Sequence, residues 1–239
     1  MRAISVSEQG KVRGNNEDAV YSNDTQGFYA IADGMGGHHA GEVASSLAIE
    51  KIRIELEELE EVTGTVMEKA FMETNKTIYE QSSHKGQKGS MGTTLSVIKV
   101  VGDRGYIGHI GDSRIYLIRN QEIIKLTEDH TYVEKLYQDG LITYEEYQDH
   151  PFKNILLKAL GSDRNPDPQV LELQLLPGDL IFMCTDGVYY HLSNEDILSL
   201  LLFYKGQRLV EPMSKLIDTR GSNDNYSFIV IDKFGGKPE

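Results

Sequence analysis

Residues Thr94–Arg114 read TLSVIKVVGDRGYIGHIGDSR, and this stretch indicates the fold class of the chain. It contains two runs of β-branched, aromatic and aliphatic residues, Thr94–Val101 and Gly105–Ile110, which are joined by Gly102 and Asp103. Such runs favour strands, and glycine beside aspartate favours a tight turn between them. The stretch therefore predicts a β-hairpin.

Strand-like runs recur along the rest of the chain. Arg114–Ile118 and Glu122–Leu126 predict a second hairpin. Val170–Leu175 is expected to pair with Leu180–Cys184 across a Pro-Gly turn, and a final strand is expected at Tyr226–Asp232.

Helical periodicity appears in two pairs of segments. Apolar residues three to four positions apart predict a helix over about Gly41–Glu61, and a capping-box pattern that begins at Thr65 predicts a second helix. Later helices are expected near Asn194–Tyr204 and Leu209–Thr219, and a polar, partly helical insert near 128–160. Helical pairs among antiparallel hairpins predict an α+β sandwich.

The composition predicts one globular domain over residues 1–239, because 39% of the residues are hydrophobic, 26% are charged and no linker interrupts the chain. The net charge of −13 disfavours nucleic acid and anionic membranes as partners. No apolar stretch approaches the roughly 20 residues of a membrane span. We therefore expect a monomeric, cytoplasmic protein. Its only cysteine, Cys184, lies in an apolar run and is expected to be a buried thiol.

Acidic residues stand where the strand-like runs end or begin. Because the end of one antiparallel strand and the start of its neighbour share an edge, these carboxylates are expected to converge on one rim of the sandwich. The set is Glu17, Asp18, Asp33, Asp112, Asp186 and Asp224.

Such a cluster needs protons or cations, because two carboxylates about 5 Å apart repel by roughly 3 kcal/mol at an effective dielectric near 20. Oxygen ligands without a thiolate favour Mg²⁺ or Mn²⁺ over Zn²⁺. Gly34 and Gly187 follow two of the aspartates and would let backbone carbonyls approach a metal. An ordinary turn is the alternative for any single Asp-Gly pair, but the recurrence at several strand ends favours a metal site.

The sequence lacks a residue that each of two other kinds of phosphate-binding site requires. The glycine-rich segment Gly36–Gly41 is followed by Glu42, where a nucleotide-binding loop needs lysine. A cysteine-dependent phosphatase would need an arginine six residues after Cys184, where Tyr190 stands. His109 lies inside a strand pattern and is expected to be structural.

Short motifs in a fixed order extend along nearly the entire chain, and together they resemble the PPM, or type 2C, metal-dependent protein phosphatases, in particular their small bacterial members. Each motif is weak alone, whereas the ordered set is specific. The motifs are Val12–Asp18, Ala32–His38, Gly41–Ala44, Met91–Thr94, Gly108–Arg114, Leu126–His130, His150–Pro151, Ala159–Gly161, Thr185–Gly187 and Gly221–Asn225.

The resemblance implies a central antiparallel β-sandwich flanked by pairs of antiparallel helices, in four αββα layers, with two metal ions at one end. Asp33 would bridge both ions, and Gly34 would offer its carbonyl to one of them. Asp186 and Asp224 would complete the ligand set of the other ion.

The same resemblance implies further roles. Glu17 and Asp18 would orient metal-bound waters, or one of them would be a direct ligand. Asp112 would hold a weaker third ion, and Arg13 would bind the substrate phosphate through its guanidinium fork. Two ions about 3.5 to 4 Å apart would lower the pKa of a bridging water, which would attack phosphorus without an enzyme nucleophile.

The implied substrates are phosphoserine and phosphothreonine in proteins, modified by a bacterial Ser/Thr kinase. The insert at about 128–160 resembles the family's flap beside the active site, which favours a protein surface as substrate. Two alternatives remain open: a non-catalytic phosphoprotein-binding module and a hydrolase of small phosphoesters. The complete set Asp33, Asp186 and Asp224 argues against the first.

The chain departs from the family pattern at three positions. Met35 stands where some relatives outside bacteria have a histidine that protonates the leaving group, which leaves this proton to a metal-bound water or to His38. Lys153 stands in place of a usual arginine, and Ser227 in place of a usual threonine. Neither replacement falls on an expected metal ligand.

Overall fold

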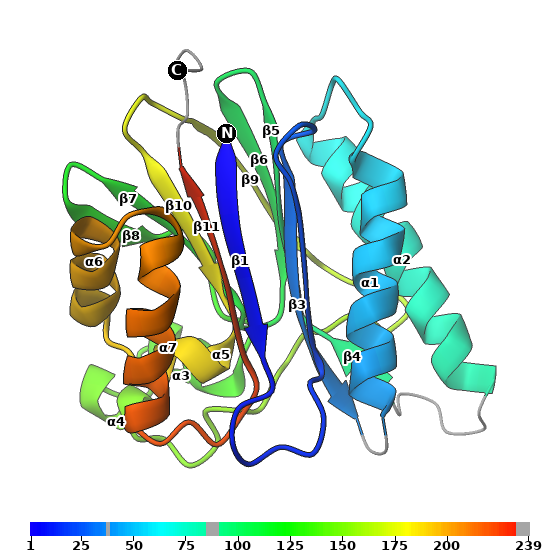
Figure 1. The fold of residues 1–239 in the computed structure, drawn as a ribbon. Coiled ribbons are helices and arrows are strands. Elements are labelled where there is room, and N and C mark those ends of the chain that lie inside the picture. The colour runs from blue at the N-terminus through cyan, green and yellow to red at the C-terminus, as the bar shows by residue number, and fades with distance from the viewer. Residues whose placement is uncertain (37–38, 85–90, 233–239) are drawn as a thin grey trace.

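The computed structural model describes residues 1–36, 39–84 and 91–232, which form two antiparallel β-sheets packed face to face (Figure 1). In the described part of the chain the first sheet runs in the order β1 (Arg2–Glu8), β11 (Tyr226–Asp232), β10 (Leu180–Cys184), β7 (Arg114–Arg119) and β8 (Glu122–Lys125). The second sheet runs β2 (Asp18–Asn23), β3 (Phe28–Gly36), β5 (Leu95–Val101), β6 (Arg104–Ile110) and β9 (Gln169–Gln174), and β4 (Met91–Thr93) pairs with β3.

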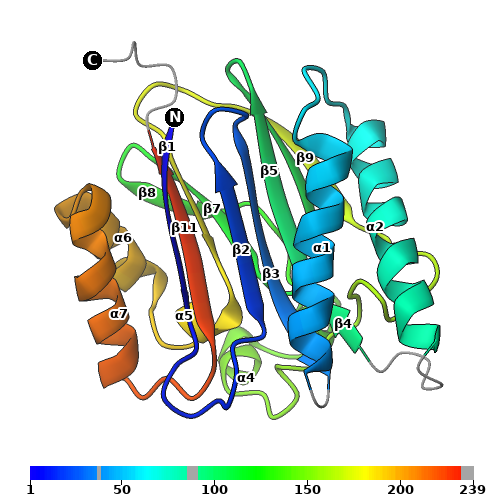
Figure 2. The ribbon, with the colours of Figure 1, turned by 45° about the vertical axis from the view of Figure 1, so that its right-hand side comes forward.

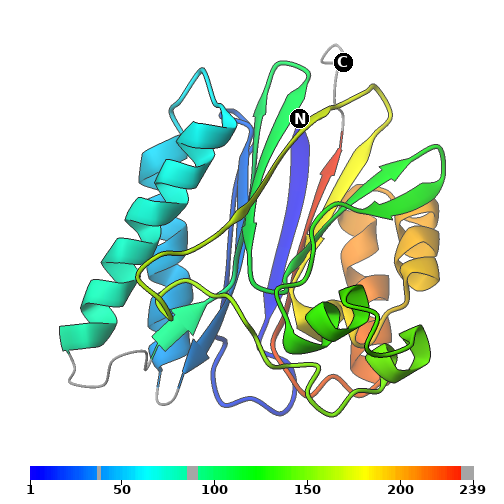
Figure 3. The same cartoon turned by 180° about the vertical axis from the view of Figure 1, so that it is seen from behind.

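Helices cover the outer face of each sheet (Figure 2). The second sheet carries α1 (Ala40–Leu56) and α2 (Gly64–His84), and the first carries α6 (Asn194–Phe203), the short 3₁₀ helix η1 (Gly206–Leu209) and α7 (Val210–Thr219). The short helices α3 (Tyr132–Gln138), α4 (Tyr144–Gln148) and α5 (Asp186–Tyr189) lie at the end of the sandwich opposite the N-terminus (Figure 3). No helix among the described residues is long and apolar enough to cross a membrane.

Among the described residues, three separate apolar clusters hold these layers together. One lies between the two sheets and includes Tyr29, Ile107 and Ile181. A second packs α1 and α2 on the second sheet, and a third packs α6 and α7 on the first sheet. Burying apolar side chains at each of three interfaces produces four layers, so the expected αββα sandwich is confirmed.

The structure confirms most of the expected elements. Residues 95–101 and 104–110 form the first hairpin, and 114–119 pair with 122–125 in the second. The 128–160 insert, called the flap from here on, contains α3 and α4 and is otherwise irregular.

Four local predictions were wrong. The strand β9 pairs with β6, whereas β10 pairs with β7 and β11 in the other sheet, so these two strands do not form a hairpin. The turn between them instead carries the chain from one sheet to the other. Asp179 fixes this turn by accepting hydrogen bonds from the Leu176 amide at 2.8 Å and from Arg119 in β7. The turn residues cannot distinguish a hairpin from a crossing between sheets, because both connections need the same tight bend.

The remaining corrections concern element ends. The first helix ends at Leu56, before the expected Glu61. The hydroxyl of Thr63 accepts the Val66 amide at 3.3 Å at the start of α2, so the expected capping box at Thr65 does not form. Asp33 lies inside β3 and does not terminate it, because pairing with β4 extends the strand to Gly36.

Candidate active site

The sheet register brings the first two acidic residues together. Asp18 begins β2 and lies directly opposite Asp33 of β3 in the antiparallel ladder. Residues that face each other across such a ladder project to the same side of the sheet. Asp186 begins α5 immediately after β10, and Asp224 lies two residues before β11. All four come from elements that meet at the α5 end of the sandwich (Figure 1).

The carboxylates in this cluster are buried or half-buried, and they repel one another. Burial and the charges of Asp186 and Asp224 raise the pKa of Asp18 to about 7. Burial and Asp224 raise the pKa of Asp186 to about 6, and burial followed by the charge of Asp18 raises the pKa of Asp33 well above its usual range. These shifts show that the site, as the protein alone builds it, has too little positive charge for its carboxylates.

Two oxygens of the cluster lack a partner. Thr185 donates its hydroxyl hydrogen to Asp18 Oδ2 at 2.9 Å. Asp18 Oδ1 and Asp186 Oδ1 are buried, and neither has a hydrogen-bond partner among the residues that the structure describes. A buried acceptor without a donor is costly, and a hard cation would satisfy both oxygens.

Within residues 1–36, 39–84 and 91–232, no three Asp, Glu, His or Cys side chains already converge as ligands of a single ion. That geometry is compatible with Mg²⁺ and Mn²⁺ sites, because Mg²⁺ in particular retains several waters and uses only one or two carboxylates. The orphaned oxygens and the chemistry of the acidic set therefore fit such an ion, with waters and backbone carbonyls as additional ligands.

The backbone at Gly34 approaches its neighbours closely. The Gly34 amide donates to the Glu17 carbonyl at 3.0 Å, and a Cβ at Gly34 would lie 2.0 Å from the Gly41 carbonyl oxygen. A Cβ at Gly41 would lie 2.7 Å from the Gly34 carbonyl oxygen and 2.8 Å from Glu17 Oε1. Only glycine at both positions lets the Gly34 carbonyl and the Glu17 carboxylate lie together here.

Arg13 pairs with one member of the cluster. Its Nη2 donates to Asp224 Oδ2 at 2.7 Å, while about half of the Arg13 side chain is exposed. The expected phosphate-binding residue is therefore placed at the site, where it neutralises an expected metal ligand. A guanidinium so placed can also reach an incoming phosphate dianion.

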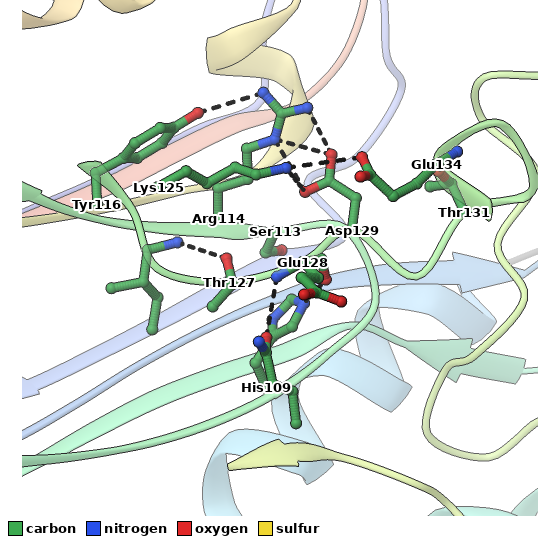
Figure 4. A network of polar contacts seen from close by, with 12 residues as sticks. His109, Ser113, Arg114, Tyr116, Lys125, Thr127, Glu128, Asp129, Thr131 and Glu134 are labelled. Atoms are coloured by element: carbon green, nitrogen blue, oxygen red, sulfur yellow. Dashed lines mark hydrogen bonds and ion pairs between the residues drawn. The ribbon is translucent and has the colours of Figure 1, made fainter. Parts of the chain in front are cut away.

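Asp112 follows β6 and is buried beside Asp186 and Asp129. Burial, followed by those two charges, raises the pKa of Asp112 well above its usual range. Arg114, an obvious partner by spacing, instead donates to Asp129 (Figure 4). The carboxyl of Asp112 therefore belongs electrostatically to the unneutralised cluster.

Sequence reasoning assigned no role to Asn225, which joins three segments at the site. Its Oδ1 accepts from the Glu17 amide at 3.0 Å, and its Nδ2 donates to the carbonyls of Gln9 and Asn15 at 2.8 and 2.9 Å. The amide thus fixes the loop that carries Arg13 and Glu17. In the sequence, the position of Asn225 next to Asp224 in the motif Gly221–Asn225 was the signal that could have indicated this role.

The other singled-out residues have structural roles or lie outside the described residues. The carbonyl of Glu128 accepts from His109 Nε2 at 3.0 Å, so Nδ1 is free to accept from Ser96 Oγ at 2.8 Å. Burial lowers the pKa of His109 to about 3, so the ring is a neutral structural element. Cys184 is buried, as expected. His38 lies outside the described residues.

The sequence model of the family described as Protein phosphatase 2C matches residues 4–136. The chain belongs to this family. It is 36% identical over 235 residues to the Serine/threonine protein phosphatase PstP of Mycobacterium tuberculosis, covering 97% of this chain and 45% of that protein. The chain therefore spans less than half of the length of that relative.

One further relative matches over nearly its full length, and the solved catalytic domain of PstP matches over nearly all of that domain. The Serine/threonine phosphatase stp of Listeria monocytogenes is 32% identical, with 98% of this chain and 96% of that protein covered. The solved catalytic domain of PstP in complex with two manganese ions superposes with a TM-score of 0.87 at 34% identity, with 97% of each chain covered. Family membership and fold therefore agree with the resemblance in the sequence motifs.

Proposed function

We propose that this protein hydrolyses phosphoserine and phosphothreonine in proteins at the cluster of buried acidic residues around Asp33. The observation that carries the proposal is a set of buried carboxylates with too little positive charge, at one end of a Protein phosphatase 2C fold. Relatives named serine/threonine phosphatases support the reaction class. The two manganese ions in the PstP structure support a divalent metal as the missing charge.

In this proposal Asp33 and the Gly34 carbonyl, together with Asp186 and Asp224, hold two ions of Mn²⁺ or Mg²⁺. Glu17 and Asp18 act through bound waters. When bound, such ions activate water and neutralise charge that develops on the phosphoryl group. The orphaned oxygens of Asp18 and Asp186 support this assignment.

Two further residues complete the proposed machinery. Asp112 holds a weaker third ion, supported by the unneutralised charge that it shares with Asp186. Arg13 binds the substrate phosphate and exchanges its contact with Asp224 for one with the phosphoryl oxygens. No side chain is needed as a nucleophile, and a water, not Met35, supplies the proton to the departing serine or threonine.

Residues 1–239 are proposed to act as a single phosphatase domain, as a cytoplasmic monomer that opposes a Ser/Thr protein kinase. The net charge of −13 and the flap beside the site support phosphoproteins, and not nucleic acids or membranes, as partners.

The direct test measures phosphate release from a phosphothreonine peptide and from p-nitrophenyl phosphate. EDTA should abolish both activities, and Mn²⁺ should restore them. Activity that survives complete metal removal would overturn the metal-dependent mechanism. Hydrolysis of the small ester without any hydrolysis of phosphopeptides or phosphoproteins would instead favour a small-phosphoester hydrolase.

A further inference from the structure

The Arg114 side chain, which the proposed machinery does not use, connects the candidate site to the flap. Its Nε lies 3.0 and 3.1 Å from the two oxygens of Asp129, and its Nη2 lies 2.5 Å from Asp129 Oδ2. Its Nη1 lies 3.3 Å from the Tyr116 hydroxyl (Figure 4). The guanidinium thus donates to several acceptors, including both oxygens of Asp129, as a bidentate arginine pair requires.

One face of this guanidinium contacts the helix that carries Asp186. Arg114 Cζ lies 3.5 Å from the centroid of the Tyr189 ring, and Tyr189 is the last residue of the four-residue helix α5, which begins at Asp186. Cation–π contact of this kind strengthens when water is excluded, and the Arg114 side chain is only 16% exposed. Arg114 therefore limits how α5 can rotate or shift relative to β7.

The N–H groups at the edge of the same guanidinium fix the base of the flap. Asp129 is 2% exposed and also accepts from Lys125 at 3.3 Å, and the Tyr147 hydroxyl of α4 lies 3.4 Å from its Oδ2. The same hydroxyl lies 3.0 Å from Glu134 of α3. Burial alone would raise the pKa of Asp129, but Arg114 and Lys125 hold it below its usual value. The charged carboxylate therefore links β7 to both flap helices.

The backbone makes the base of the flap continuous with the site. The His130 amide donates to the Gly111 carbonyl at 2.8 Å, directly before Asp112. The returning segment of the flap contacts the outgoing one, because the Leu157 amide donates to the His130 carbonyl at 2.8 Å. Displacing Asp129 would thus move both legs of the flap and the residue next to Asp112.

We propose that Arg114 is a positioning residue that couples the flap to α5, so that the flap and Asp186 keep one relative arrangement. This inference rests on the proposed phosphatase function. Lysine cannot replace Arg114 fully, because an ammonium offers no planar fork for Asp129 while its charge lies over the Tyr189 ring.

The same strand supplies a matched control. Arg119, at the other end of β7, pairs with the buried Asp179 through Nε at 2.8 Å and Nη2 at 2.6 Å, but Asp179 anchors the turn before β10 and not the flap. Arg114→Lys and Arg119→Lys therefore remove equivalent bidentate pairs, and only the first should affect the site.

The experiment combines Mn²⁺ titration calorimetry with amide hydrogen exchange in the full chain. For Arg114→Lys we expect Mn²⁺ to bind about 10- to 100-fold more weakly, as for other residues that orient metal ligands. Exchange should accelerate both in residues 186–190 and in 129–157. Arg119→Lys should leave Mn²⁺ affinity and exchange in both segments unchanged.

Two further variants separate the two contacts. Tyr147→Phe removes only the α4 link, so exchange should accelerate in the flap while Mn²⁺ affinity changes less than in Arg114→Lys. Asp129→Asn should reproduce the Arg114→Lys pattern, and it replaces that variant if Arg114→Lys does not fold. Wild-type Mn²⁺ affinity and wild-type exchange at both segments, with only a lower melting temperature, would show that Arg114 is merely structural. Measuring phosphopeptide hydrolysis by the wild-type protein tests the proposed function separately.

Discussion

Two groups of buried aspartates in this molecule have opposite electrostatic environments. Asp129 and Asp179 are each 2% exposed and each receives a bidentate arginine, which holds its pKa below the usual value although burial alone would raise it. Asp18 is buried and Asp186 is half-buried, but both face other carboxylates, and burial raises their pKa values to about 7 and about 6. Burial is common to both groups, so the difference lies in whether the fold supplies a positive charge.

This difference separates structural from functional acids. A buried carboxylate paired with arginine has its charge neutralised within the protein, and removing it lowers the stability of the fold. A buried cluster of carboxylates without such partners has its charge neutralised only when an external cation binds. Five predictions test this distinction, from the largest expected effect to the smallest.

The largest effect is expected for Asp33→Asn. This variant should lose at least about 1,000-fold of the activity towards p-nitrophenyl phosphate, because one proposed ligand is removed from both ions at once. Circular dichroism should show an intact fold. Near-wild-type turnover in the folded variant would sink the two-metal assignment.

Asp112→Ala should keep the two inner ions and yet reduce turnover of phosphopeptides by about tenfold or more, since Asp33, Asp186 and Asp224 remain. Calorimetric metal titration and kcat are the measurements. Unchanged stoichiometry and kcat with a lower melting temperature would place Asp112 among the structural acids.

Asp179→Ala should lower the free energy of unfolding by about 1 to 3 kcal/mol, because the Leu176 amide and the partly exposed Arg119 lose their acceptor. Urea denaturation measures this loss. The kcat towards phosphopeptide should not change, and a large fall in kcat would contradict the division into structural and functional acids.

Arg13→Ala removes the arginine that pairs with Asp224 of the cluster. The KM for phosphopeptide should rise about tenfold, equal to about 1.4 kcal/mol, with a smaller change in kcat, because the guanidinium holds phosphate in both the ground and transition states. If kcat alone fell, Arg13 would have to act only in the transition state.

The smallest effect is a dependence of thermal stability on pH in the metal-free protein. Because the folded-state pKa values of Asp18 and Asp186 are raised, their stabilising contribution is full below about pH 4 and is lost as pH rises through about 6 to 7. The melting temperature in EDTA should therefore be lower at pH 7.5 than at pH 5. Excess Mn²⁺ should reduce this difference, and a metal-free melting temperature that rises with pH over this window would contradict the description of the cluster.

Much of this molecule follows from local sequence patterns. The hairpin at 94–110 follows from β-branched runs around a Gly-Asp turn, and the outer helices follow from apolar periodicity. The expected convergence of Asp18 and Asp33 rests on antiparallel geometry, and the β2–β3 register places the two residues opposite each other. The functional hypothesis also came from sequence, because the type and order of the acidic residues limit the possible chemistry.

Only the tertiary structure decided which distant groups meet. The Pro-Gly turn at 177–178 fits either a hairpin or a crossing between sheets, and the pairing partners β6 and β11 settle the choice. Arg114 lies two residues from Asp112 in sequence but pairs with Asp129, whereas Asn225 fixes the loop that carries Glu17. Sequence patterns determine the local backbone and the kind of side chain, while charge pairing depends on distances that only packing sets.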